Sequence, residues 1–162
     1  MSSTEVSLIT SETTIKVSST LDKTVGKKHL IDGSPETCWT SQQGLPQWIS
    51  LTFPSSITPT RVSLTFQGGF VGRKCAVYYK PSASEDQTAS IEKESSWVLL
   101  TTIYPEDVNR KQSFSLTSAS SSNEEKKDLP IRTSQIKLTF EESSDFFGRI
   151  TVYDLSLEGL EG

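Results

Sequence analysis

The chain has few of the residues on which most catalytic and metal sites depend. Its 162 residues include one histidine, His29, and two cysteines, Cys38 and Cys75. Any Ser-His-Asp or Cys-His arrangement would have to use His29, and no G-x-S-x-G elbow accompanies it. The H-E-x-x-H pattern, paired zinc cysteines and the G-x-x-x-x-G-K-[ST] loop are also absent. These absences predict a protein that is not an enzyme.

Membrane and secretion signals are missing as well. The first ten residues, MSSTEVSLIT, contain neither a basic segment nor an apolar one, and no apolar run reaches the length of a membrane span. Neither cysteine belongs to a C-x-x-C pair, so we interpret both as reduced thiols, with a Cys38–Cys75 disulfide as the alternative. We therefore expect an intracellular protein, nuclear or cytoplasmic, that is not secreted and does not contact membranes.

Positive charge is not in excess. Lys and Arg number 16 against 20 Asp and Glu, which gives a formal net charge of −4. Without a basic surface the chain would not attract a phosphate backbone, so direct nucleic-acid binding is not expected. The hydrophobic fraction is 33%, and Ser and Thr are abundant. That composition suits exposed sheet faces and argues against a helical bundle.

The chain does contain many short segments with apolar residues at every second position. They lie at 48–53, 61–67, 75–80, 97–103, 112–116, 135–140 and 149–157, with a first strand at either 5–9 or 14–17. A period of two is typical of strands with one buried face. The pattern predicts a polar lead-in over 1–14 and one all-β sandwich or barrel over 15–160. Trp39, Trp48 and Trp97 adjoin such runs, and we expect them in the core.

Two stretches interrupt the strand pattern. Residues 81–96 and 117–130 are rich in Ser and charged residues and have almost no large apolar side chains. Neither stretch can bury enough apolar surface to offset its ordering entropy, so both are predicted to be mobile insertions. Their length also allows functional loops, which is the alternative.

The most specific pattern is KHLIDGSPETCWTSQQGLPQWISLTF, at residues 28–53. An Asp-Gly turn leads to Trp39, and a Gln-Trp-Ile-x-Leu run then opens a strand at Trp48. This arrangement resembles the discoidin or coagulation-factor C-type family. The resemblance implies the galactose-binding-like fold, a single-domain antiparallel jelly-roll β-sandwich that serves as a recognition platform.

Three longer motifs narrow the resemblance to a small, single-domain intracellular branch of that family. They are FQGGFVGR at 66–73, YPEDVNRKQSF at 104–114 and TFEESSDFFGRITVYDL at 139–155. The branch is typified by a protein associated with an orphan nuclear receptor. The resemblance therefore implies a protein partner, and among protein partners a nuclear-receptor or transcription-related one. We expect a monomeric, non-enzymatic interaction adaptor. The first alternative is a carbohydrate-binding, lectin-like domain. The second is an enzyme whose site is not recognised.

The resemblance also implies a structural calcium ion. In the family an Asp-Gly loop often wraps the ion, and an acid entering the last strand completes the site. Asp32 and Thr37 occupy the Asp and Thr positions of that loop, Leu30 its Ala position, and Asp154 the position of the acid. Ser34 stands where metal-binding members often carry Asp or Asn, which removes one ligand. The alternative is that Asp32 and Thr37 only cap the turn through hydrogen bonds.

Candidate partner-binding residues lie in two glycine-flanked loops. They are Gln67, Phe70, Arg73, Phe146, Phe147 and Arg149. The rings either plug the end of the sandwich or stand exposed as anchors, and each Arg could hold a carboxylate or phosphate in a bidentate contact. The alternative for the arginines is a structural ion pair with Asp145 or Glu141 that ties two loops together.

Overall fold

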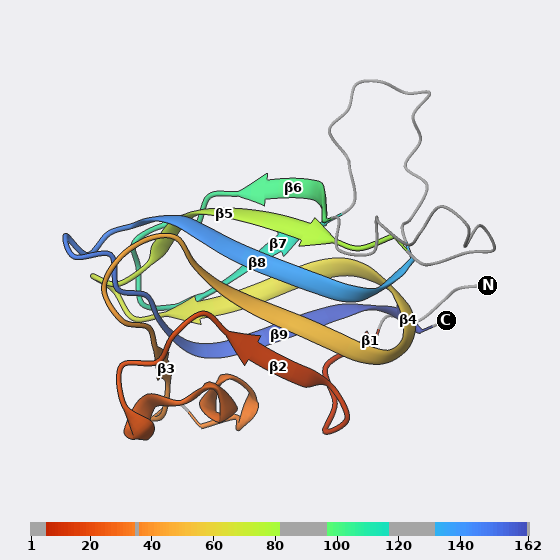
Figure 1. Ribbon diagram of the computed structural model, residues 1–162, viewed down its shortest axis with the longest axis horizontal. Helices are drawn as coiled ribbons and strands as arrows, with labels where there is room; N and C mark the ends of the chain where they lie inside the picture. The colour runs from red at the N-terminus through yellow and green to blue at the C-terminus, as the bar shows by residue number, and fades with distance from the viewer. Residues whose placement is uncertain (1–5, 35, 82–96, 117–131, 162) are drawn as a thin grey trace.

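The computed structural model describes residues 6–34, 36–81, 97–116 and 132–161. In chain order its strands are β1 (Val6–Ser7), β2 (Thr14–Val17), β3 (Trp39–Thr40), β4 (Gln47–Phe66), β5 (Gly72–Tyr79), β6 (Val98–Ile103), β7 (Lys111–Ser115), β8 (Thr133–Ser143) and β9 (Thr151–Glu161). Two short 3-10 helices, η1 (Lys23–Val25) and η2 (Lys27–Ile31), precede β3. The strand pairs of these residues are all antiparallel, which confirms the jelly-roll prediction (Figure 1).

Strand β4 passes from one layer of the sandwich to the other. Its first half pairs with β2 and β8, and its second half pairs with β7 and β9. Ile57 pairs with residues of both β8 and β9, so it marks the crossing. The sequence predicted two strands, at 48–53 and 61–67. The backbone stays extended between them, and the two form one bent strand.

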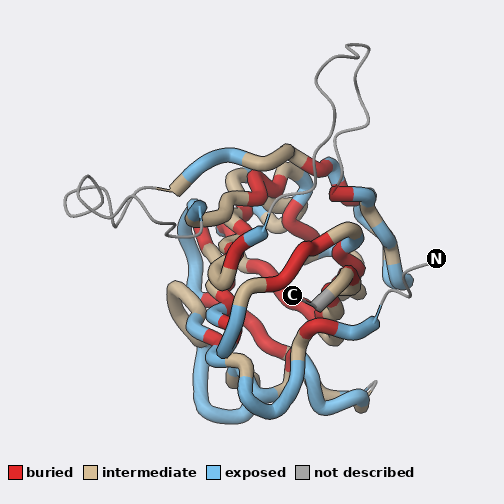
Figure 2. The backbone as a smooth tube through the Cα atoms, turned by 90° about the vertical axis from the view of Figure 1, so that its right-hand side faces the viewer, coloured by how far each residue is buried: buried red, intermediate tan, exposed pale blue. Residues whose placement is uncertain are grey.

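The two layers pack through the inward positions of the alternating runs. Buried side chains include Ile49, Leu51, Val62, Leu64, Phe66, Ile136, Leu138, Phe140, Val152, Leu155 and Leu157. Figure 2 shows this buried interior as the red part of the tube. The rings of Phe66 and Phe140 meet edge to face, with 5.8 Å between their centroids. A Cβ atom at Gly72 would lie 2.4 Å from the Phe140 ring, so this position in the core requires glycine.

The tryptophan prediction is right for Trp39 and wrong for Trp48 and Trp97. Trp39 is fully buried, and its Nε1 donates a hydrogen bond to the Ser19 carbonyl oxygen at 3.0 Å. Trp48 and Trp97 are only partly buried. The Lys137 ammonium lies 4.7 Å and 5.5 Å from their ring centroids. Since Ile49 faces the core, its neighbour Trp48 must face outward, where a lysine covers it.

Both segments that the sequence offered as a first strand contain one, β1 within 5–9 and β2 at 14–17. Strand β1 pairs with β9, and Leu8 is buried in the core, although both lie within the stretch expected as a lead-in, 1–14. The two predicted insertions lie almost entirely outside the described residues. Cys75 is buried, Cys38 is partly exposed, and both are free thiols. Among the described residues no helix is long and apolar enough to span a membrane.

Candidate functional site

Four connecting segments meet at the end of the sandwich drawn on the left of Figure 1. They are 41–46, 67–71, 104–110 and 144–150. Backbone and side-chain hydrogen bonds join them: Gly44 N–H donates to the Phe147 carbonyl at 2.9 Å, and Val71 N–H donates to Ser144 Oγ at 2.9 Å. A Cβ atom at Gly148 would lie 3.0 Å from the Gly44 backbone, which shows how closely two of the segments approach. The four loops therefore form one connected surface.

An ion pair fixes the loop between β8 and β9. Arg149 Nε donates to Asp145 Oδ2 at 3.1 Å, and its backbone N–H donates to the same oxygen at 3.0 Å. The Asp145 side chain is 10% exposed and that of Arg149 is 30% exposed. The hydrogen bond from Arg149 lowers the pKa of Asp145, and burial opposes this shift. Of the two alternatives for Arg149, the structure shows the ion pair with Asp145, so a carboxylate already contacts its guanidinium.

Aromatic rings surround that guanidinium. The Cζ atom of Arg149 lies 5.1 Å from the Phe70 ring centroid and 5.8 Å from that of Phe147. Phe147 in turn meets Phe146 edge to face at 5.2 Å. Phe146 is 92% exposed and Phe147 is 53% exposed. We call Phe70, Phe146, Phe147 and Arg149 the loop-end surface.

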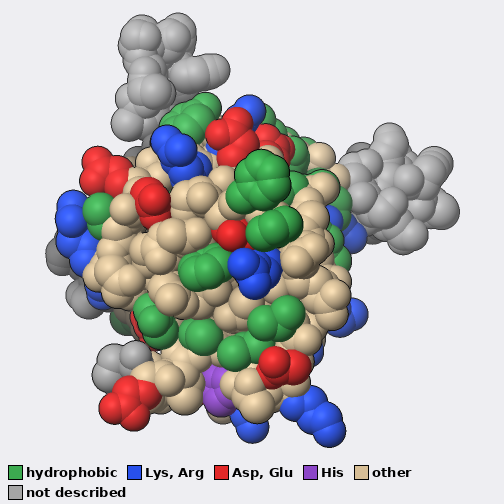
Figure 3. Space-filling view, turned by 90° about the vertical axis from the view of Figure 1, so that its left-hand side faces the viewer, with side chains coloured by type: hydrophobic (Ala, Val, Ile, Leu, Met, Phe, Trp, Pro, Cys, Tyr) green, Lys and Arg blue, Asp and Glu red, His purple; other side chains and the backbone are tan. Residues whose placement is uncertain are grey.

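The view onto this end of the molecule shows hydrophobic side chains gathered around a basic one (Figure 3). Leu45 and Tyr104, in two of the same loops, are also exposed. Clustered exposed apolar groups on a soluble protein commonly mark an interaction site. The structure thus brings Phe70, Phe146, Phe147 and Arg149 together at this end of the sandwich, with Arg149 paired to Asp145, and their role in partner binding stays a prediction.

Gln67 contacts this cluster through its backbone, and Arg73 shows no contact with it among the described residues. The backbone of Gln67 closes the turn: its carbonyl accepts from the Phe70 N–H at 3.0 Å. Arg73 is an exposed residue of β5. Two residues that the sequence did not single out shape the same loop, since Asn109 Oδ1 accepts from Gly68 N–H and Asp107 Oδ1 from Gly69 N–H. Short Asp and Asn side chains in a polar turn are typical of such caps, and that was the available signal.

The Asp-Gly turn is closed by its own hydrogen bonds. The Asp32 carboxylate accepts from the Thr37 hydroxyl at 2.7 Å and 2.9 Å and from the Ser34 N–H at 3.0 Å, and lies 2.9 Å from His29 Nδ1. These bonds, that of Thr37 first, lower the pKa of Asp32 to about 2. Leu30 is fully buried beneath the turn. The capping alternative thus describes the observed contacts.

Asp154 lies close enough to this turn to interact electrostatically with Asp32. Burial raises the pKa of Asp154 most, Lys111 lowers it, and the Asp32 charge raises it. Calcium takes about six to eight oxygen ligands. Both Asp32 oxygens and the Thr37 hydroxyl are engaged with each other, and the described residues contain no cluster of three or more His, Cys, Asp or Glu. As arranged, the side chains of Asp32, Thr37 and Asp154 alone supply fewer oxygens than the ion takes, and calcium binding stays a prediction of the resemblance.

The architecture defines a fold class, the galactose-binding-like or discoidin-type domains. A family 32 carbohydrate-binding module of Clostridium perfringens, solved with galactose, superposes with a TM-score of 0.70 at 18% identity over 96% of this chain and 99% of that one. A second such module, solved with GalNAc-β-1,3-galactose, gives a TM-score of 0.67 at 17% identity, covering 94% and 99%. At these identities the likeness shows the fold alone.

The chain belongs to the nuclear receptor 2C2-associated protein family, which confirms the predicted branch. It is 38% identical over 156 residues to the Danio rerio protein of that name, covering 94% of this chain and 95% of the relative. The Homo sapiens protein is 35% identical over 156 residues, covering 94% and 96%. No family model matches the chain.

Proposed function

We propose that this protein is a non-enzymatic interaction adaptor, active in the nucleus or cytoplasm as a monomer, that binds a protein partner through the loop-end surface. The observation that carries the proposal is Phe146, a large aromatic side chain left 92% exposed. It stands on a loop that the Asp145–Arg149 pair holds in place. The relatives are named for association with a nuclear receptor, which supports a protein partner and, more finely, a transcription-related one.

A fixed aromatic anchor suits protein recognition for a physical reason. Association costs free energy when flexible side chains are ordered, and a ring on a preorganised loop reduces that cost. Aromatic residues that enter a partner's pocket commonly dominate interface energetics. Phe146 and Phe147 can supply the buried centre of such an interface, and the polar side chains of the neighbouring loops its rim.

Carbohydrate binding is the weaker candidate for the same surface. A sugar site needs polar groups free to converge on one pocket. Here the Arg149 guanidinium is taken up by Asp145 and covered by Phe70 and Phe147. Two observations support the non-enzymatic assignment. The histidine of the chain, His29, is engaged with Asp32, and burial raises the pKa of Cys75, which disfavours a reactive thiolate.

The test is affinity capture of the tagged full-length chain from its own cells. Three forms are compared: the natural chain, the double variant Phe146→Ala/Phe147→Ala and the control Leu99→Ala. Leu99 is 53% exposed, as Phe147 is, but lies on β6. We expect the natural chain and the control to recover the same partner and the double variant to lose it. Equal recovery by all three forms would contradict the proposal, and saturable galactose binding by the purified chain would favour the carbohydrate alternative.

A further inference from the structure

A carboxylate is hydrogen-bonded to the segments that carry the rings of the loop-end surface. Asp107 lies in the segment 104–110, and its Oδ1 accepts from the Gly69 N–H at 2.8 Å and from the Ser144 hydroxyl at 3.2 Å. Gly69 precedes Phe70, and Ser144 lies just before the Asp145-Phe146-Phe147 run. The Asp107 carboxylate therefore lies where the segments 67–71, 104–110 and 144–150 meet.

These contacts hold the carboxylate in one orientation and leave part of it open. Ser144 is itself fixed, because its Oγ accepts from the Val71 N–H at 2.9 Å and its N–H donates to the Val71 carbonyl at 2.9 Å. Asp107 is an exposed residue, and within the described residues no hydrogen bond or ion pair reaches its Oδ2. One carboxylate oxygen thus positions the side chain, and the other faces no protein group.

The remaining charges of this end of the sandwich are already paired. The charged residues of the four connecting segments are Glu106, Asp107, Arg110, Asp145 and Arg149. Arg149 pairs with Asp145 at 3.1 Å, and Arg110 pairs with Glu106 at 3.6 Å. Asp107 therefore gives the connecting segments an uncompensated negative charge beside exposed rings. A partner that covered this charge without pairing it would meet a desolvation penalty.

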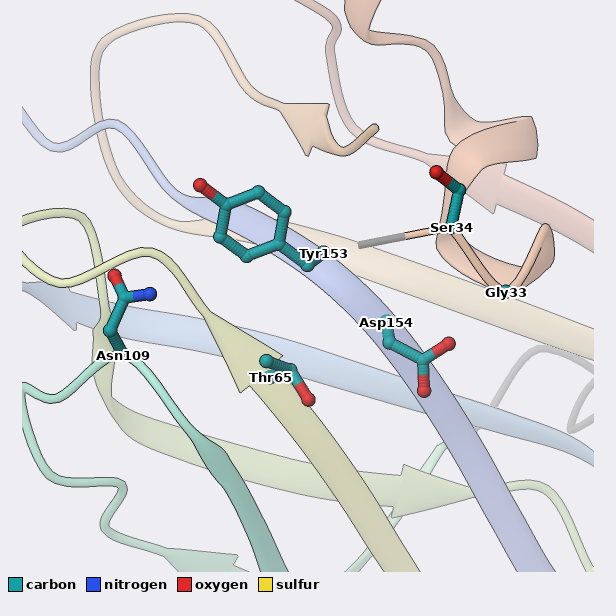
Figure 4. Close-up of a pocket in the computed structure, with 6 residues that line it drawn as sticks. All are labelled: Gly33, Ser34, Thr65, Asn109, Tyr153 and Asp154. Carbon is teal, nitrogen blue, oxygen red and sulfur yellow. The ribbon is translucent and has the colours of Figure 1, made fainter. Parts of the chain in front are cut away.

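Asn109, on the same segment, belongs to a different site. Its Oδ1 accepts from the Gly68 N–H at 2.7 Å, and its side chain lines a pocket of about 430 Å³ between β4, β9 and the Asp-Gly turn (Figure 4). Asp107 is not among the residues that line this pocket. Its charge is therefore assigned to the loop-end surface and not to the candidate metal turn.

We propose that the loop-end surface selects a protein partner that presents a lysine or arginine beside the apolar pocket for Phe146, with the cationic group against Asp107 Oδ2. The carboxylate keeps its bonds to Gly69 and Ser144, so the contact requires no rearrangement of the loops. A neutral or acidic partner surface fits less well, because it would leave the carboxylate covered and unpaired. This inference names the chemistry of the partner and rests on the proposed function.

The experiment uses a substitution that removes the charge and keeps the hydrogen bonds. Asp107→Asn retains an Oδ1 acceptor for Gly69 and Ser144, so their amide NMR signals should stay close to those of the natural chain. The probe is the protein that the natural chain captures from its own cells and that Phe146→Ala/Phe147→Ala does not. It is titrated calorimetrically against each full-length form at about 0.1 M and about 1 M salt, where the Debye lengths are about 10 Å and about 3 Å.

We expect Asp107→Asn to bind this protein about fivefold more weakly than the natural chain at the lower salt concentration. The difference should fall below about twofold at the higher concentration, since salt screens an ion pair but not the contact of the rings. Glu12→Gln is the matched control, because it makes the same change in net charge at an exposed position in the turn before β2. It should bind as the natural chain does at both concentrations.

Other outcomes overturn the inference. Unchanged binding by Asp107→Asn at the lower salt concentration would mean that no cation meets the carboxylate. An equal loss at both concentrations, with shifted Gly69 and Ser144 signals, would mean that Asp107 only positions the loops.

The two proposals can fail separately. Loss of binding by Phe146→Ala/Phe147→Ala with unchanged binding by Asp107→Asn overturns this inference and leaves the proposed function intact. If no captured protein distinguishes the natural chain from the double variant, the proposed function fails, and this inference fails with it.

Discussion

Replacing Phe146 by alanine should separate binding from folding. Its side chain is 92% exposed, and its ring contact is with Phe147, at 5.2 Å between centroids. Truncation removes almost no buried apolar surface, so the free energy of unfolding should stay within about 0.5 kcal/mol of the natural value. Urea denaturation of both proteins measures this difference.

The effect on partner binding should be much larger. A Phe side chain that becomes buried at an interface removes roughly 150 Å² from water. At about 25 cal/mol per Å² this is worth at most about 4 kcal/mol. Ordering costs and the surface that alanine still buries reduce the loss to about 2 kcal/mol, or roughly a 30-fold weaker Kd.

Calorimetric titration of the captured partner measures that Kd, with Leu99→Ala as the control of similar chemistry on β6. An unchanged Kd for Phe146→Ala would refute the anchor role. A loss of unfolding free energy of about 2 kcal/mol or more would show instead that the ring packs into the fold.

The strands were predictable because side-chain alternation reports burial directly. Ile49 with Leu51, and Ile136 with Leu138, fill the core as their spacing indicated. Trp48 was mispredicted because hydrophobic character was given more weight than its place in the same alternation. The lysine that covers it, Lys137, comes from a strand far away in the sequence.

The candidate site was only partly predictable. The loop motifs offered Phe146 and Phe147 either as plugs or as exposed anchors, and the structure shows both exposed. A sequence does not say whether Arg149 faces a partner or its neighbour Asp145. That choice depends on the turn bringing the two together, as the 3.1 Å Nε–Oδ2 distance shows. The surroundings of Asp154 could not be predicted either, since they depend on which side chains the pairing of β4, β7 and β9 brings near it, Lys111 among them.

Four further predictions follow from the contacts. Gly159→Ala should lower the free energy of unfolding by about 3 kcal/mol or more in urea denaturation, because its Cβ would lie 2.1 Å from the Thr58 carbonyl oxygen. Gly26→Ala is the control and should cost little, since the nearest atom to its Cβ would be 4.0 Å away. Asp154→Asn should raise the melting temperature at neutral pH, since the raised pKa penalises the ionised form; the gain should vanish below the carboxyl's ordinary value of 3.8. The Asp32 contacts should stabilise the fold above pH 3.8 and be lost as pH falls toward about 2, so Asp32→Asn should flatten that part of an acid titration. The resemblance predicts a higher melting temperature in millimolar calcium than in chelator, because the ion would bind the native state; equal midpoints would leave Asp32 and Thr37 as an ordinary cap of the turn.

The most direct test of the interaction role is photo-crosslinking in the protein's own cells. A photoreactive aromatic amino acid is placed at position 146 in one form of the full-length chain and at position 99, on β6, in another. The loop-end surface predicts that position 146 crosslinks to a discrete protein partner and that position 99 does not. The account is contradicted if position 146 gives no crosslinked protein, or if both positions give the same set.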